Sequence, residues 1–197
     1  MKKLSIAFIA AVTAFTFQAC HSNKDSKATA DSLNKAADPS KTDTSKMAMP
    51  VTVEQDDAKF AVKAAAGGMA EVMLGKLAQD KGSTPVKDFA GMMVKDHSQA
   101  NDELMTLAKS KNIALPTVLD KDMQKNFDDL DKKAGPDFDK AYVKLMVDDH
   151  KEDVKEFDKA TQKLKDPDLK AFAVKTLPVL KMHLASISKI DSTMKKK

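Results

Sequence analysis

The chain has 197 residues, with 33 basic and 29 acidic side chains and a formal net charge of +4 at pH 7. All of the lysine and arginine positions are lysine, and the chain has one tyrosine and no tryptophan. Arginine forks and aromatic rings make most of the specific contacts to phosphates and bases, so this composition argues against a nucleic-acid-binding protein.

The first predicted element is a signal peptide over residues 1–19. A basic start precedes an apolar run over residues 4–17, which is too short for a comfortable membrane span. The only cysteine, Cys20, follows this run and cannot form an internal disulfide. Its position resembles a bacterial lipobox, although Phe17 and Gln18 depart from the usual residues. We expect cleavage before Cys20 and lipidation of its thiol, with ordinary signal-peptidase cleavage as the alternative.

Residues 20–50 are predicted to be a disordered tether that starts at the lipidated cysteine. They are mostly small or polar and show no apolar period, so they bury too little surface to offset the entropy of ordering. A flexible chain of this length spans roughly 30 Å. We therefore expect an exported protein that is bound to a membrane through the lipid on Cys20. The expected location is the outer membrane, facing the periplasm.

Residues 51–197 are predicted to form one all-helical domain. With seven lysines and four acids in residues 1–50, this part keeps 26 lysines and 25 acids and is nearly neutral. No segment alternates like a strand. Four long helices are expected over 55–80, 84–111, 137–165 and 167–194, with a shorter helix over 117–133 between the second and the third. Proline at a first helical position, after Thr84 and after Asp166, marks two of the starts.

Each long helix carries an apolar stripe with alternating steps of four and three residues, which is typical of a helical-bundle seam. One polar residue interrupts each stripe. In chain order these residues are Glu71, His97, His150 and His183. A polar side chain in a core costs free energy unless it is paired. The first two long helices form one predicted hairpin, and the last two form another. Within each hairpin the two polar residues lie at similar distances from the turn, so we expect the four side chains to meet in one layer.

An internal repeat bears on the connectivity. Residues 92–97 match residues 145–150 at an offset of 53, so the second and third long helices look like related copies. Parallel copies require residues 112–136 to run back along the bundle, and about seventeen helical residues cover roughly 25 Å. A plain up-down bundle agrees equally well with the depths of the polar residues.

Three imidazoles and one carboxylate suit a single transition metal ion, Fe, Zn, Mn or Cu. A carboxylate-bridged di-iron centre would need Glu-x-x-His motifs, and Val94, Val147 and Leu180 stand where the glutamates should be. The alternative is a metal-free hydrogen-bond network that fixes the register of the helices. No serine-hydrolase, P-loop or His-Glu-x-x-His motif is present, so no catalytic residue is assigned.

Several neighbours of the histidines are second-tier candidates. Asp153, on the face of His150, could be a ligand or an acceptor that orients an imidazole. Met93 and Met146 each lie four residues before a seam histidine and could supply thioethers to copper, although methionine is also an ordinary core filler. By contrast, Asp96 and Asp149 are turned about 100° from their adjacent histidines, and we expect them to be solvated or to pair with lysines.

The chain also resembles the DUF4142 family over nearly all of residues 55–190. The resemblance rests on segments that surround the seam residues, namely residues 71–78, 86–97, 138–150 and 177–184. It implies an exported bacterial protein with a ferritin-like four-helix bundle, and it supplies no activity. Two functions are therefore expected as alternatives: metal handling or stress response at the envelope, or a non-catalytic envelope interaction module.

Overall fold

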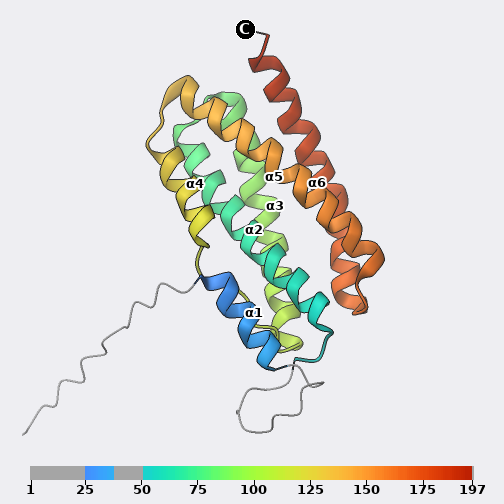
Figure 1. Cartoon of the computed structure of the whole chain (residues 1–197). Helices are drawn as coiled ribbons and strands as arrows, with labels where there is room; N and C mark the ends of the chain where they lie inside the picture. Colours follow the sequence, from blue (N-terminus) through green and yellow to red (C-terminus); the bar gives the residue numbers. More distant parts are fainter. Residues whose placement is uncertain (1–24, 38–50, 197) are drawn as a thin grey trace, which may run out of the picture.

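The computed structural model describes residues 25–37 and 51–196, and every regular element within these ranges is an α-helix. The all-helical prediction is confirmed. The helices are α1 (Ser26–Ala36), α2 (Gln55–Lys81), α3 (Thr84–Ser110), α4 (Lys121–Asp131), α5 (Gly135–Lys163) and α6 (Pro167–Met194) (Figure 1). None of these helices combines the length and apolar character that a membrane crossing needs. The predicted signal peptide and Cys20 lie outside the described residues.

The four long helices α2, α3, α5 and α6 surround a common interior. Helix α2 packs against α3 and α5, and α6 packs against the same two helices from the other side. The backbone N–H of Ser83, just before α3, donates to Asp139 in the first turns of α5 at 3.0 Å. Helices α3 and α5 therefore start at the same end and run in the same direction, from the upper to the lower end in Figure 1. The chain between them, with α4, crosses back along the molecule, which excludes the up-down alternative.

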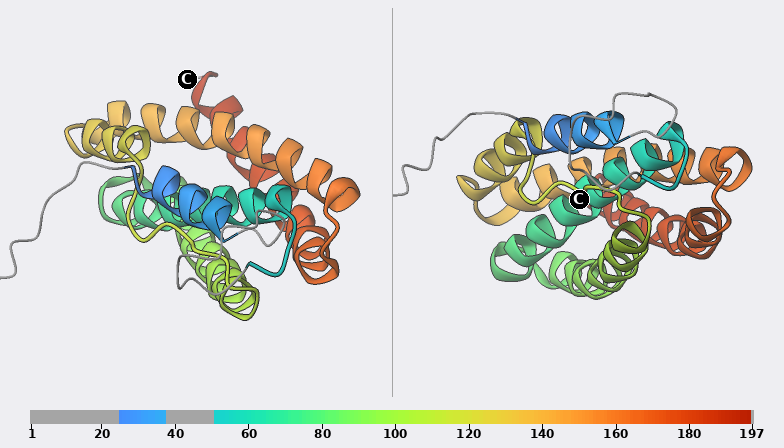
Figure 2. Two further views of the ribbon diagram at one scale, coloured as in Figure 1. Left: turned by 60° about the horizontal axis from the view of Figure 1, so that its bottom comes forward. Right: turned by 90° about the horizontal axis from the view of Figure 1, so that it is seen from below.

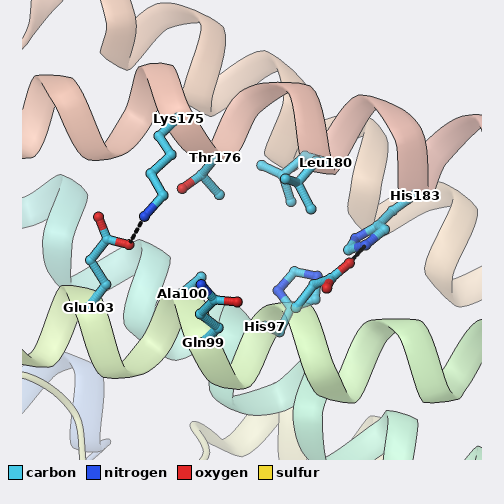
Figure 3. A pocket seen from close by; sticks show the side chains of 10 residues that line it. His97, Gln99, Ala100, Glu103, Lys175, Thr176, Leu180 and His183 are labelled. Atoms are coloured by element: carbon cyan, nitrogen blue, oxygen red, sulfur yellow. Dashed lines mark hydrogen bonds and ion pairs between the residues drawn. The ribbon is translucent and has the colours of Figure 1, made fainter.

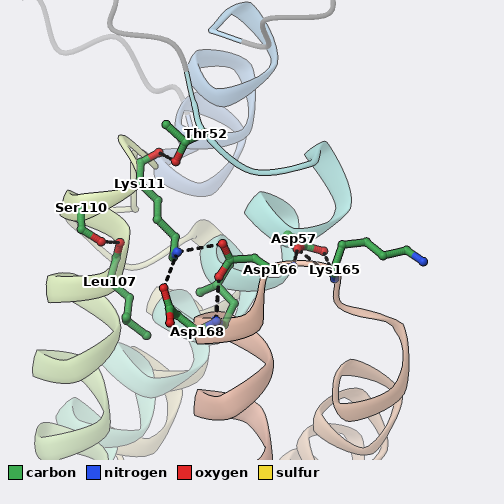
Figure 4. A network of polar contacts seen from close by, with 9 residues as sticks. Thr52, Asp57, Leu107, Ser110, Lys111, Lys165, Asp166 and Asp168 are labelled. Atoms are coloured by element: carbon green, nitrogen blue, oxygen red, sulfur yellow. Dashed lines mark hydrogen bonds and ion pairs between the residues drawn. The ribbon is translucent and has the colours of Figure 1, made fainter.

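Polar contacts fix the opposite end of the bundle (Figure 4). The ammonium group of Lys111, just after α3, lies 2.7 Å from Asp166 and 2.8 Å from Asp168 at the start of α6. The buried carboxylate of Asp57, near the start of α2, accepts from the backbone N–H groups of Lys165 and Asp166. These contacts hold the loop between α5 and α6 against α2 and α3.

The apolar core consists of two clusters, one toward each end of the four helices. One includes Phe60, Leu104, Phe157 and Phe172, and the rings of Phe60 and Phe157 meet edge to face with centroids 5.1 Å apart. The other cluster is built from Leu74, Ala78, Val86, Phe89, Ala90, Met93, Leu130, Phe138, Tyr142, Val143, Met146, Val147 and Ile187. In each long helix the polar seam residue falls between the two clusters. The core is therefore divided by a buried polar layer.

The prediction of a disordered tether over residues 20–50 is wrong for residues 26–36, which form α1 on the outside of α2 (Figure 2). Asp25 caps this helix by accepting from two backbone N–H groups. The buried side chain of Asn34 donates to the carbonyl of Ala114 at 2.9 Å and accepts from its N–H at 2.7 Å. Only two residues of α1 are buried, so its own sequence carries too little apolar pattern to reveal a helix. Residues 20–24 and 38–50 lie outside the described ranges.

Helix α4 is shorter than predicted, with eleven residues rather than the span 117–133. The carboxylate of Asp120 accepts from the backbone N–H of Met123 at 2.8 Å and so caps the helix at this point. Before it, the N–H groups of Thr117 and Val118 donate to the hydroxyl of Ser26. Thr117 and Val118, which the sequence pattern assigned to this helix, therefore hydrogen-bond to Ser26 at the start of α1 and lie outside α4.

Candidate metal centre

Four helices each contribute one buried polar side chain to the middle of the molecule. Glu71 comes from α2, His97 from α3, His150 from α5 and His183 from α6. Both His150 and His183 are 0 % exposed, and Glu71 and His97 are 2 % and 6 % exposed. The structure therefore brings together all four residues that the seam pattern singles out.

The three imidazole rings form a nearly equilateral triangle. Their centroids are separated by 5.2 Å between His97 and His183, 5.5 Å between His150 and His183, and 5.8 Å between His97 and His150. One ring nitrogen from each histidine lies within 4.8 Å of the other two. Three helices thus place three potential ligand atoms around a common point.

In each histidine, one ring nitrogen faces an oxygen acceptor. The pairs are His97 Nδ1 with Glu71 Oε2 at 2.8 Å, His150 Nδ1 with the Met146 carbonyl at 3.0 Å, and His183 Nε2 with Asp96 Oδ2 at 3.0 Å. A neutral imidazole has one N–H and one lone pair, and these acceptors hold the N–H. The lone pairs therefore lie on His97 Nε2, His150 Nε2 and His183 Nδ1. All three of these atoms are buried without a hydrogen-bond partner in the described structure. Glu71 Oε1, which also lacks a hydrogen-bond partner there, lies 3.5 Å from His150 Nε2.

Burial in the core keeps the histidines neutral. It lowers the pKa of His97 and of His183, and it lowers the pKa of His150 to about 3, with the neighbouring imidazoles adding to the effect at His150. The opposing influence of nearby carboxylates on His97 and His183 is smaller. All three rings are thus in their metal-binding form at neutral pH.

Glu71 belongs to a group of carboxylates beside the histidines. Its oxygens lie within 4.8 Å of carboxylate oxygens from Asp149 and Asp153. Burial raises the pKa of Glu71 well above its ordinary value, and the charge of Asp149 adds to this effect. Burial and the Glu71 charge likewise raise the pKa of Asp153, which is hydrogen-bonded to Glu71. Glu71 and Asp153 therefore favour sharing a proton over carrying two buried charges.

The predictions for Asp96 and Asp149 are wrong. Asp96 accepts from His183 across the interface between α3 and α6, and Asp149 is half-buried in the carboxylate group. A residue next to a core-facing residue points about 100° away from it around the helix, and in a bundle this direction can face a neighbouring helix rather than solvent. The spacing of residues within one helix does not show which of the two it faces. The sequence signal that was available is the adjacency of each aspartate to a seam histidine.

The second-tier methionines lie in the apolar cluster toward one end of the bundle. Both Met93 and Met146 are fully buried there. Met146 contributes its backbone carbonyl, which orients His150. The seam pattern does not single out Tyr142, whose buried hydroxyl also lacks a hydrogen-bond partner among the described residues. Burial and the charge of Glu71 raise the pKa of this phenol, so it stays protonated.

A family profile described as "Domain of unknown function (DUF4142)" matches residues 42–190, which include all four seam residues. The chain belongs to the DUF4142 family. Among solved structures, the DUF4142 chain is similar to a crystal structure of a DUF305 fragment from Deinococcus radiodurans, with a TM-score of 0.64. The match covers 72% of this chain and 98% of that chain at 7% sequence identity, so it shows the fold alone. No curated protein matches the chain.

Proposed function

We propose that this DUF4142 protein binds one transition metal ion through His97 Nε2, His150 Nε2 and His183 Nδ1, inside a ferritin-like four-helix bundle. The observation that carries the proposal is that each of the three histidines has one buried ring nitrogen without a hydrogen-bond partner, and that the three residues can bring one ring nitrogen each within 4.8 Å of the other two. A buried polar atom without a partner costs about 1–3 kcal/mol. One bound cation would satisfy all three atoms at once.

The spacing of the rings fits one ion. At a metal–nitrogen distance of 2.0–2.1 Å, three imidazoles in tetrahedral or trigonal geometry place their ring centres roughly 5.2–5.5 Å apart. The centroid separations of 5.2, 5.5 and 5.8 Å are close to these values. Binding therefore needs only small side-chain movements.

In this proposal Glu71 and Asp96 orient ligands rather than bind the ion. Each accepts from the ring nitrogen that lies away from the lone pair, on His97 and on His183 respectively. Such acceptors fix the tautomer and increase the basicity of the ligating nitrogen. A bound divalent cation would in turn favour the ionised form of Glu71. Glu71, which the sequence pattern groups with the ligands, thus takes a supporting role.

A site of three neutral nitrogen ligands favours some metals over others. Imidazole suits Zn²⁺, Cu²⁺ and Fe²⁺, whereas Mn²⁺ prefers oxygen ligands. The thioethers of Met93 and Met146 lie in the apolar cluster, which gives less support to copper(I). We therefore expect Zn²⁺, Cu²⁺ or Fe²⁺ to bind in preference to Mn²⁺ or copper(I).

We further propose that the protein is exported and held at the envelope by a lipid on Cys20, where it takes part in metal handling or stress response. Support for this location comes from the signal-like start of the sequence and its single cysteine. The outer membrane, facing the periplasm, is the proposed position.

Metal uptake by the full-length chain tests the proposed site. Protein freed of metal and then equilibrated with Zn²⁺ should hold one equivalent by elemental analysis. The triple variant His97→Ala, His150→Ala, His183→Ala should hold none, whereas His21→Ala, at the remaining histidine, should match the wild type. If the wild type takes up no metal, the metal-free network is the better account of the polar layer.

A further inference from the structure

A pocket of about 140 Å³ lies between α3 and α6 and reaches the candidate metal centre. His97 and His183 line one end, and an ion pair between Lys175 and Glu103, at 2.6 Å, lies at the other (Figure 3). Lys175 is 62% exposed at its side chain, so this end borders on solvent. The pocket thus joins the surface to two of the three imidazoles.

The other sides of the centre are nearly closed, with a cavity of only about 20 Å³ beside Glu71 and His97. The ring of His150, from α5, is 0 % exposed and is not part of the pocket wall. Phe89 meets both His150 and His183 edge to face, with centroids 6.3 Å away in each case. An ion bound to the three nitrogens would therefore have free space mainly on the α3–α6 side.

We propose that the metal centre keeps one coordination position open to this pocket and takes a small anion of two to four atoms there. This inference rests on the proposed metal site. Three protein ligands leave a four-coordinate ion one position short, which is the arrangement of reactive rather than structural zinc sites. The centre is then suited to binding an external ligand and not only to holding its metal.

Size and lining set the class of ligand. A liquid water occupies about 30 Å³, so the pocket has room for about four or five waters. Its volume of about 140 Å³ is well below the roughly 300–1,000 Å³ of pockets for drug-sized ligands. Ala100, Val179 and Leu180 make part of the wall apolar. A ligand would therefore gain most of its affinity from the metal. The charge that favours an anion is that of the divalent ion, because Lys175 is paired with Glu103 and Asp96 adds a carboxylate to the lining.

Azide binding to the copper-loaded, full-length chain tests this inference. After loading with one equivalent of Cu²⁺, titration with sodium azide should give a saturable charge-transfer band. The substitution Val179→Phe fills the pocket, so it should keep the copper and lower the azide affinity at least tenfold. Val174→Phe is the matched control, because Val174 is on the same helix and 54% exposed. It should bind azide like the wild type.

A second variant, Ala100→Phe, blocks the pocket from the opposite wall on α3 and replaces Val179→Phe if that variant fails to fold. The outcomes separate the two proposals. Absence of copper uptake by the wild type overturns the metal site and, with it, the open position. Copper uptake without an azide band overturns the open position alone. Wild-type azide affinity in a folded, copper-loaded pocket variant shows that the ligand does not enter between α3 and α6.

Discussion

At the scale of single residues, the chemistry of the centre depends on which nitrogen of each ring is free. His150 uses a backbone carbonyl to hold its N–H, whereas His97 and His183 use carboxylates. Because Glu71 and Asp96 come from different helices than the rings they orient, the geometry of the lone pairs depends on the packing of the bundle. The acceptors should therefore matter for metal affinity almost as much as the ligands do.

Asp96→Asn tests this dependence. An amide oxygen still accepts from His183 but carries no charge, so we expect Zn²⁺ affinity to fall about 10–100-fold. Competition with a chromophoric chelator measures this change. Asp148→Asn is the control, because Asp148 is exposed and pairs with Lys144 at 2.5 Å. Equal affinity in the two variants would mean that Asp96 does not orient a ligand.

The neutral state of His150 predicts a pH dependence of stability in the metal-free protein. Its pKa is about 3 when folded, against 6.5 as the ordinary value, so below pH 6.5 the unfolded chain takes up a proton that the folded chain does not. The folded state loses about 1.4 kcal/mol per pH unit from this residue as the pH falls. His150→Gln removes this contribution. The free energy of unfolding of the wild type relative to the variant should therefore drop by about 2 kcal/mol from pH 7 to pH 5.

Urea unfolding in the presence of a chelator gives both free energies. A difference between wild type and variant that stays constant over this pH range would show that His150 is not a buried neutral base in the folded protein.

At the scale of elements, α1 shows what a helical pattern cannot reveal. Its position depends on Asn34, which pairs with the backbone of Ala114 eighty residues away. It also depends on Ser26, whose hydroxyl accepts from the backbone N–H of Thr117 before α4. These contacts are long-range and polar, so no periodic pattern in residues 26–36 predicts them. The long helices were predictable because each buries a continuous stripe of side chains.

Asn34→Ala tests whether α1 is part of the folded unit. Loss of the amide leaves the backbone N–H and carbonyl of Ala114 without their partner, which should cost about 1–3 kcal/mol. Ser32→Ala, an exposed position on the same helix, should change stability by less than about 0.5 kcal/mol. Urea unfolding of the full-length chain measures both. Equal stabilities of the two variants would indicate that α1 does not pack as described.

At the scale of the whole molecule, a polar layer separates two apolar clusters and draws on all four long helices. The sequence predicted this layer because each polar residue interrupts a seam at a matched depth. It did not predict Asp96, because a single helix does not show which neighbour its flank will face. Depth along the helices also left the connectivity open, and contacts at the helix ends, such as Ser83 with Asp139, decide it.

Because the ligands come from three helices, metal binding should stabilise the folded chain as a whole. At a free Zn²⁺ concentration one hundred times the dissociation constant, the free energy of unfolding should rise by about 2.7 kcal/mol. His97→Gln should show little of this increase, because it removes one of the three nitrogens. Calorimetric unfolding with and without Zn²⁺ provides the comparison. An equal gain in His97→Gln would mean that Zn²⁺ binds elsewhere.

The most direct test of a three-imidazole centre is X-ray absorption spectroscopy of the protein loaded with one equivalent of Zn²⁺. We predict a first shell with three imidazole nitrogens at about 2.0 Å and one further light atom, and loss of one imidazole in His150→Gln. A first shell made up mainly of carboxylate oxygens, or one unchanged by His150→Gln, would contradict the proposed centre.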